Sequence, residues 1–94
     1  MNIMRNISIE SAILSLKSSK EVRDFLVDIC TPTEIKAIEE RWNVAQLLFS
    51  KKYSYREIAE KLKVSTATVT RVARFLFTEE VGGYKKILKR LLNE

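Results

Sequence analysis

The 94-residue sequence contains no histidine, one cysteine, one proline and two glycines. Without histidine, a zinc site, a Cys–His nucleophile and a Ser–His triad are all excluded. The scarcity of glycine and proline leaves little turn chemistry for a multi-stranded sheet, so we expect an all-α fold. No paired acids stand out, so an enzyme that works through carboxylates alone is the least favoured class of function. The sequence predicts no cofactor and no metal.

Long apolar runs are also absent. The longest uncharged segment, residues 42–50, is nine residues long and too short to cross a membrane. The first residues, MNIMRN, lack the apolar stretch of a signal peptide. We therefore expect a cytoplasmic protein with no membrane partner. Cys30 follows the apolar segment FLVDI, and we expect it in a core.

Acidic residues are missing from one part of the chain. The net charge is +5, and no Asp or Glu occurs between Glu60 and Glu79. Residues 1–52 hold eight basic and seven acidic side chains, whereas residues 53–94 hold nine and five. A basic half of this kind indicates a polyanion partner, although a solvated surface is the alternative explanation.

Three helix starts are marked by a Ser or Thr cap followed three residues later by Glu, the pattern of a capping box. The pairs are Ser18 with Glu21, Thr31 with Glu34 and Ser54 with Glu57, and each Glu should reach back to its cap. Pro32 stands at the first position of the second of these helices. The expected helices cover residues 8–17, 19–29, 32–51, 55–62, 66 onward and 83–93, in a single domain of residues 1–94.

Apolar residues at helical spacing predict which faces of the two flanking helices turn inward. In the long helix they are Ile35, Ile38, Trp42, Ala45 and Leu48, and in the last helix Tyr84, Ile87, Leu88 and Leu91. Two further short amphipathic helices precede them. A chain of this size cannot bury all these faces alone, so we expect a homodimer.

The segment KVSTATVTRVARFL, residues 63–76, is rich in β-branched residues and could be a strand. Its apolar residues Val69, Val72, Ala73 and Leu76 instead follow the i, i+3, i+4, i+7 spacing of one helix face. A strand would bury Arg71 on the same face as Val69, which is unfavourable for a charge. The segment is therefore predicted to be a helix that begins near Thr66, with Ser65 as its cap.

Two short helices joined by residues 63–65 form a predicted helix-turn-helix over residues 55–77. Ala59 is small where the helices would cross, and Val64 would fill the turn. Many such turns contain glycine, and Lys63 takes the neighbouring position here.

The outward face of the second helix is rich in threonine, and each Thr costs a helix up to roughly 0.7 kcal/mol relative to Ala. A recognition helix explains this choice, because Thr offers a hydroxyl and a methyl group to base edges in the major groove. The bases or nearby phosphates would be contacted by Arg56, Thr66, Ala67, Thr68 and Thr70, and the DNA backbone by Lys61, Arg71 and Arg74. The alternatives are a helical hairpin with a neutral surface, and a helix-turn-helix that contacts a protein of the transcription or replication machinery. Lys85, Lys86, Lys89 and Arg90 form a basic face that we expect to be solvated.

The segments TPTEIKAIEERWNVAQLL and YSYREIAEKLKVSTATVTRVARFL resemble the Trp repressor family, in particular its YerC/YecD-type members. The resemblance covers about residues 31–92. It implies a six-helix, all-α fold whose protomers interlock through their N- and C-terminal helices into a dimer. It also implies a regulator, and by type a repressor, that binds double-stranded DNA.

The resemblance also implies a ligand site. Tryptophan would lie between Arg41 and Arg71, with Thr31 near its carboxylate and amino groups. Val72 stands where the family has a glycine, and Phe75 where it has a serine. We expect these two side chains to fill the pocket, so that DNA is bound without L-tryptophan; whether another small-molecule effector exists is left open. Arg41 would then be a structural residue paired with a nearby acid, rather than a ligand contact.

Overall fold

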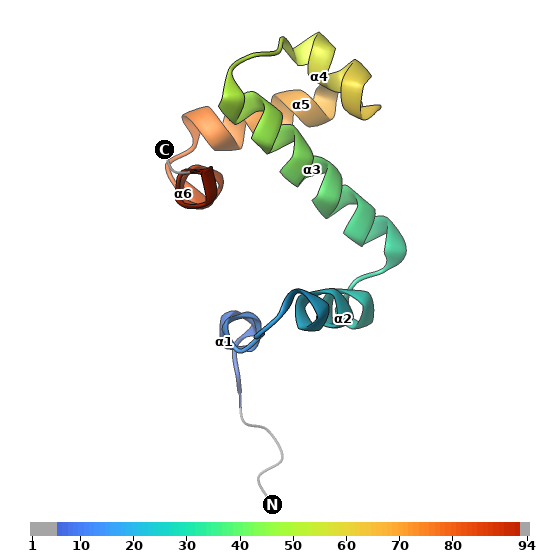
Figure 1. Ribbon diagram of the computed structural model, residues 1–94, viewed down its shortest axis with the longest axis vertical. Coiled ribbons are helices and arrows are strands. Elements are labelled where there is room, and N and C mark those ends of the chain that lie inside the picture. The colour runs from blue at the N-terminus through green and yellow to red at the C-terminus, as the bar shows by residue number, and fades with distance from the viewer. Residues whose placement is uncertain (1–5, 93–94) are drawn as a thin grey trace, which may run out of the picture. The chain divides into compact units, whose positions relative to one another are not determined.

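The computed structural model describes residues 6–92, which form six α-helices and one short π-helix, with no strand in that range (Figure 1). The helices are α1 (Ile9–Leu14), α2 (Ser19–Ile29), α3 (Pro32–Ser50), α4 (Tyr55–Leu62), α5 (Thr66–Ala73), the π-helix η1 (Arg74–Thr78) and α6 (Gly83–Leu92). The predicted all-α class with six helices is confirmed.

One predicted helix is shorter in the structure. We expected the first helix to reach residue 17, but α1 ends at Leu14. The Ser15 hydroxyl donates a hydrogen bond to the Ala12 carbonyl at 2.6 Å, and such bonds compete with continued helix. The last predicted residue of the final helix, residue 93, lies outside the described residues.

The chain divides into two compact units, with the boundary between Ile35 and Lys36. The single domain expected from the sequence stays a prediction.

The first unit contains α1 and α2, neither of which has a buried residue. Their apolar side chains border a cavity of about 430 Å³, which also includes the half-buried Cys30. The residues that line it are Ile9, Ile13, Leu16, Val22, Phe25, Leu26, Ile29 and Cys30. The unit therefore presents an apolar face and no closed core of its own.

The second unit has a closed core to which α3, α4, α5, η1 and α6 all contribute. The buried residues are Val44, Ala45, Leu48, Ile58, Ala59, Val69, Val72, Ala73, Leu76 and Leu88. Each large apolar side chain in such a core stabilises the fold by about 1.5–3 kcal/mol. Residues Val69, Val72, Ala73 and Leu76 are all buried, which confirms that the segment around residue 70 is helical.

Part of the predicted inward-facing pattern is wrong for the single chain. Ile38 in α3 is 43% exposed, and in α6 Ile87 is 37% and Leu91 is 62% exposed. Only Leu88 of α6 is fully buried, and Tyr84 is half-buried. These exposed positions face away from the one core that the described residues of the second unit build.

Side-chain caps position the helix starts as the sequence indicated, with one difference. Ser54 and Glu57 form a reciprocal capping box. Thr31 and Glu34 bond in the same reciprocal way, at 3.1 and 2.8 Å. The Glu21 carboxylate instead accepts from the backbone N–H of Lys17 at 2.8 Å. Lys17 is the residue directly before Ser18, whose N–H was the expected donor. The Ser18 hydroxyl still accepts from the Glu21 N–H, so the start of α2 is unchanged.

Candidate nucleic-acid interface and the cavity beside it

The turn between α4 and α5 is a Schellman motif. The Val64 N–H donates to the Ala59 carbonyl at 3.1 Å, across the end of α4. Val64 also packs against the core that contains Ala59, as the sequence predicted. The sequence placed Lys63 next to the usual glycine position. In the structure Lys63 itself has the left-handed conformation, with φ 57° and ψ 46°. This is the position where glycine is usual, so the turn keeps its shape at some conformational cost.

The start of α5 is fixed by Ser65. Its hydroxyl accepts from the Thr68 N–H at 3.0 Å and lies 3.0 Å from the Thr68 hydroxyl. Thr68 is half-buried, and its hydroxyl is engaged within the protein. Its predicted contact with DNA therefore rests on its methyl group or on rearrangement of this bond.

The other predicted interface residues are exposed and belong to the second unit. Arg56 and Lys61 lie on α4, and the rest lie on α5 and the first residue of η1. The exposed members of this second group are Thr66, Ala67, Thr70, Arg71 and Arg74. The structure thus brings the predicted residues together on two consecutive helices that share one core.

The cationic side chains of this surface are partly held by aromatic rings. The guanidinium carbons of Arg71 and Arg74 each lie 4.9 Å from the centre of the Phe75 ring. The Lys61 ammonium lies 5.7 Å from the Tyr53 ring. Such contacts stabilise exposed cations by about 0.5–1 kcal/mol. These contacts restrict the positions of the charged groups, while the N–H donors of those groups stay available to phosphates.

Arg74 also has an acidic neighbour. Its Nε lies 3.9 Å from a carboxylate oxygen of Glu79, with both side chains largely exposed. A long, exposed ion pair of this kind contributes little to stability. It does reduce the net positive charge that this position offers to a phosphate.

Sequence reasoning missed the π-helix η1, which follows α5 directly. The Glu79 N–H donates to the Arg74 carbonyl at 2.9 Å, a bond to the fifth preceding residue. Such wider turns are rare and occur often at functional sites. The change of helix type turns the side chains from Arg74 onward away from the directions that a continuous α-helix would give them. No composition or spacing signal in RFLFT marks this change.

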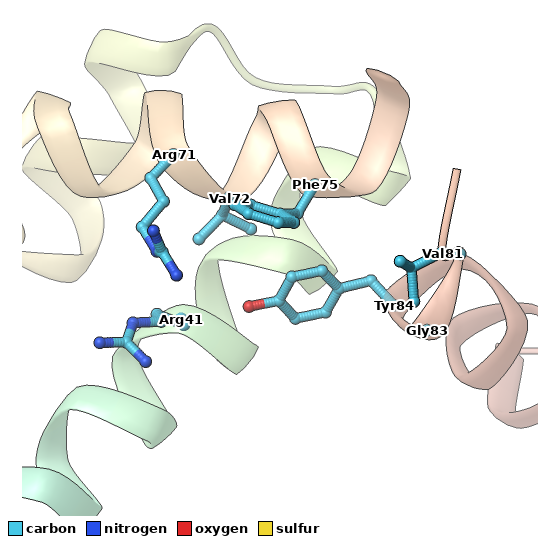
Figure 2. A pocket seen from close by; sticks show the side chains of 8 residues that line it. Arg41, Arg71, Val72, Phe75, Val81, Gly83 and Tyr84 are labelled. Carbon is cyan, nitrogen blue, oxygen red and sulfur yellow. The ribbon is translucent and has the colours of Figure 1, made fainter. Parts of the chain in front are cut away.

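A cavity of about 300 Å³ lies beside α5 (Figure 2). Its lining residues are Arg41, Arg71, Val72, Phe75, Val81, Gly82, Gly83 and Tyr84. The expectation that Val72 and Phe75 fill this space is therefore wrong, because they form part of the wall and leave the cavity open. Val72 is buried with the core residues, so most of its bulk is used there.

Tyr84 lines the same cavity. The sequence predicted only that Tyr84 lies on the inward face of the last helix. Figure 2 shows its ring projecting from the start of α6, with its hydroxyl end toward Arg41. The signal in the sequence was the pair Gly82-Gly83 directly before a tyrosine. Gly82 has φ 74°, so the chain can turn sharply into α6 at that point.

The charges on the cavity wall are all positive. Arg41 and Arg71 line it, and no acid does. The expected ion pair of Arg41 is also wrong, since no carboxylate in residues 6–92 lies within 4.0 Å of its guanidinium nitrogens. Two guanidinium groups with apolar and aromatic neighbours suit a small, partly apolar anion. Thr31 belongs to the first unit, where its hydroxyl caps α3, and its role in ligand binding stays a prediction.

Metal-binding clusters are absent from residues 6–92, where no group of three or more His, Cys, Asp or Glu side chains could hold a metal ion. None of the helices described is both long enough and apolar enough to cross a bilayer.

Comparison with known proteins gave consistent matches. The sequence model of the family described as "Trp repressor protein" matches residues 8–92. The chain is 39% identical over 66 residues to "Uncharacterized protein YerC" of Bacillus subtilis (strain 168), a match that covers 70% of this chain and 62% of YerC. It is 36% identical over 81 residues to "Trp operon repressor homolog" of Mannheimia succiniciproducens, which covers 81% of this chain and 79% of that protein.

A solved structure agrees with these matches. The crystal structure of "a TrpR like protein from Eubacterium eligens ATCC 27750" superposes with a TM-score of 0.80 at 42% sequence identity. The match covers 88% of this chain and 84% of that one. The overall fold is therefore shared with that solved protein.

Proposed function

The chain belongs to the Trp repressor family, and from that membership we propose that it is a cytoplasmic regulator of transcription that binds double-stranded DNA as a homodimer. The observation that supports this most is the outward face of α5. There Thr66, Ala67 and Thr70 are exposed beside Arg71 and Arg74, with no acid between residues 61 and 78. A recognition helix needs this combination of hydrogen-bonding groups toward bases and positive charge toward phosphates. Repression is the direction in which we propose that it acts.

The dimer is proposed on the apolar surface that the single chain leaves uncovered. None of the residues in α1 or α2 is buried, and Leu14, Ile13 and Val27 are among those exposed. A second copy would cover this surface, as obligate dimers of small helical chains do. Two recognition helices would then meet half-sites about one helical turn apart.

The proposed regulator does not require L-tryptophan. Val72 forms part of the cavity wall, and the Tyr84 ring already stands in the space (Figure 2). A planar ligand would have to share the cavity with that ring. Calorimetric titration with L-tryptophan should show no heat at millimolar ligand, and the affinity for DNA should be unchanged. A tenfold gain in that affinity, about 1.4 kcal/mol of coupling, would contradict the proposal.

The function itself is tested by capture of genomic fragments on the full chain, followed by sequencing. We expect a small set of fragments that share a two-fold symmetric sequence. Recovery of fragments without any shared sequence, or of none, would favour the alternative in which the helix-turn-helix contacts a protein.

A further inference from the structure

Tyr84 separates two cavities. Its side chain lines the 300 Å³ cavity beside α5, and it also lines a second cavity of about 250 Å³ with Ile38, Arg41 and Trp42 of α3. Tyr84 and Arg41 are the two residues common to both linings. Removal of the tyrosine ring would therefore join the two spaces into one gap between α3, α5 and α6.

The ring, rather than the hydroxyl, makes the contacts that hold Tyr84 in place. The side chain is half-buried and packs against the core residues of the second unit. Within residues 6–92 its hydroxyl has no hydrogen-bond partner, although its end faces Arg41 (Figure 2). A phenylalanine at this position would keep the same packing.

The tyrosine connects α6 to the recognition helix across this gap. On the α5 side, the cavity is bounded by Arg71 and Val72, and Val72 is fully buried in the core. On the η1 side it is bounded by Phe75, whose ring contacts the guanidinium groups of Arg71 and Arg74. The Tyr84 ring thus stands behind the residues that carry the positive charge of the proposed DNA-binding face.

We propose that the Tyr84 ring fills the gap between these two cavities and is a positioning residue that supports α5 and η1 in the orientation required for DNA binding. The inference rests on the proposed function, because the orientation that it supports is that of the DNA-binding helix. With the ring in this position, the proposed DNA binding would need no small molecule to orient α5. A bound ligand could take over this support of α5 and η1 only by displacing the Tyr84 ring.

The test is chemical rescue of Tyr84→Ala by p-cresol, the free side chain of tyrosine. The alanine variant should lose at least about tenfold in DNA affinity, within the usual range of coupling between sites. Millimolar p-cresol should restore at least about fivefold of that loss and leave the wild type unchanged. Tyr84→Phe should bind DNA within about twofold of the wild type, since the hydroxyl has no partner.

Leu88→Ala is the matched control, because Leu88 is fully buried on the same helix but lines neither cavity. This variant loses core packing, and p-cresol should not restore its DNA affinity. If the alanine variant at Tyr84 does not fold, Tyr84→Leu keeps apolar contact with the core but lacks the planar ring, and should lose at least about fivefold.

Four outcomes overturn the inference: wild-type DNA affinity in Tyr84→Ala, wild-type affinity in Tyr84→Leu, no rescue by p-cresol, or equal rescue of Leu88→Ala. If the wild type binds no duplex at all, the proposed function fails. The role of the Tyr84 ring is then still decided by calorimetry, since p-cresol should bind Tyr84→Ala more tightly than the wild type and raise the Tm of that variant more. Absence of that binding overturns the inference independently of DNA.

Discussion

Different side chains on α4, α5 and η1 are proposed to contact the bases and the DNA backbone. Arg56 and Thr70 are exposed, and the Arg56 guanidinium has no carboxylate within 4.0 Å in the described chain. Arg74 shares its charge with Glu79 and lies over the Phe75 ring. The first two are therefore free to approach base edges, while Arg74 is arranged as a fixed cation.

Arg56→Ala and Thr70→Ala should each reduce the preference for the specific duplex by about 1–3 kcal/mol. This is the usual contribution to discrimination of one good hydrogen-bonded contact between a side chain and a base. Arg74→Ala should weaken specific and random duplexes alike. It should also reduce the salt slope by about two units, one for each protomer, if its contact is to a phosphate. Fluorescence anisotropy with both duplexes at four salt concentrations measures these effects. Equal losses on both duplexes for all three variants would refute this division of roles.

Lys63 offers a test of the turn that is independent of DNA. A side chain in the left-handed conformation costs roughly 1–2 kcal/mol, part of which glycine recovers. Lys63→Gly should therefore raise the free energy of unfolding by about 0.5–1 kcal/mol in urea titration. Glu60→Gly, at an exposed position inside α4, should lower it by about 1 kcal/mol. A loss of stability in Lys63→Gly equal to that in the control would show that the strained turn is stabilised by contacts of the lysine side chain.

The helices and their connections show what can be predicted from a sequence of this kind. The starts of α2, α3, α4 and α5 were predictable because each is set by a Ser or Thr cap within three residues of the bond that it makes. The core face of α5 was predictable because its apolar spacing excludes a strand. These features depend on neighbours in sequence, which a single chain displays directly.

The η1 segment and the Tyr84 cavity were not predictable by the same reasoning. In η1 the Glu79 N–H donates to the Arg74 carbonyl in place of the usual helical bond, and no local sequence pattern encodes that change. The position of Tyr84 depends on where α6 begins relative to α3 and α5. The exposed Ile87 and Leu91 were misassigned for a related reason, since helical spacing identifies an apolar face but not what covers it.

The connection into α6 gives a prediction with its own control. Gly82 has φ 74°, whereas a Cβ at Gly83 would meet no atom within 4 Å. Gly82→Ala should lower the free energy of unfolding by about 1 kcal/mol or more, because the alanine is strained in that conformation. Gly83→Ala should leave it unchanged or raise it slightly. Thermal unfolding followed by circular dichroism distinguishes them, and equal effects of the two substitutions would show that the turn adapts without a glycine.

We expect the chain as a whole to be a dimer, with its net positive charge concentrated in the half that we propose binds DNA. Sedimentation at micromolar concentration should give twice the mass of one chain. Ile13→Glu, at an exposed apolar position of α1, should shift the protein toward monomers and lower its Tm. Lys20→Glu, on the exposed polar side of α2, should not change the mass. A wild type that sediments as a cooperatively folded monomer would exclude the proposed dimer.

The central claim is that the α4–α5 face binds duplex DNA with sequence preference, and salt-dependent competition binding tests it most directly. The measurement compares the duplex recovered from genomic capture with a scrambled duplex of equal length and composition. Three cations in each of two protomers, Lys61, Arg71 and Arg74, predict a slope of about −5 for log affinity against log salt concentration. We expect the recovered duplex to be preferred by at least tenfold, or about 1.4 kcal/mol, at physiological salt. Equal affinity for both duplexes, or a slope near zero, would contradict the account.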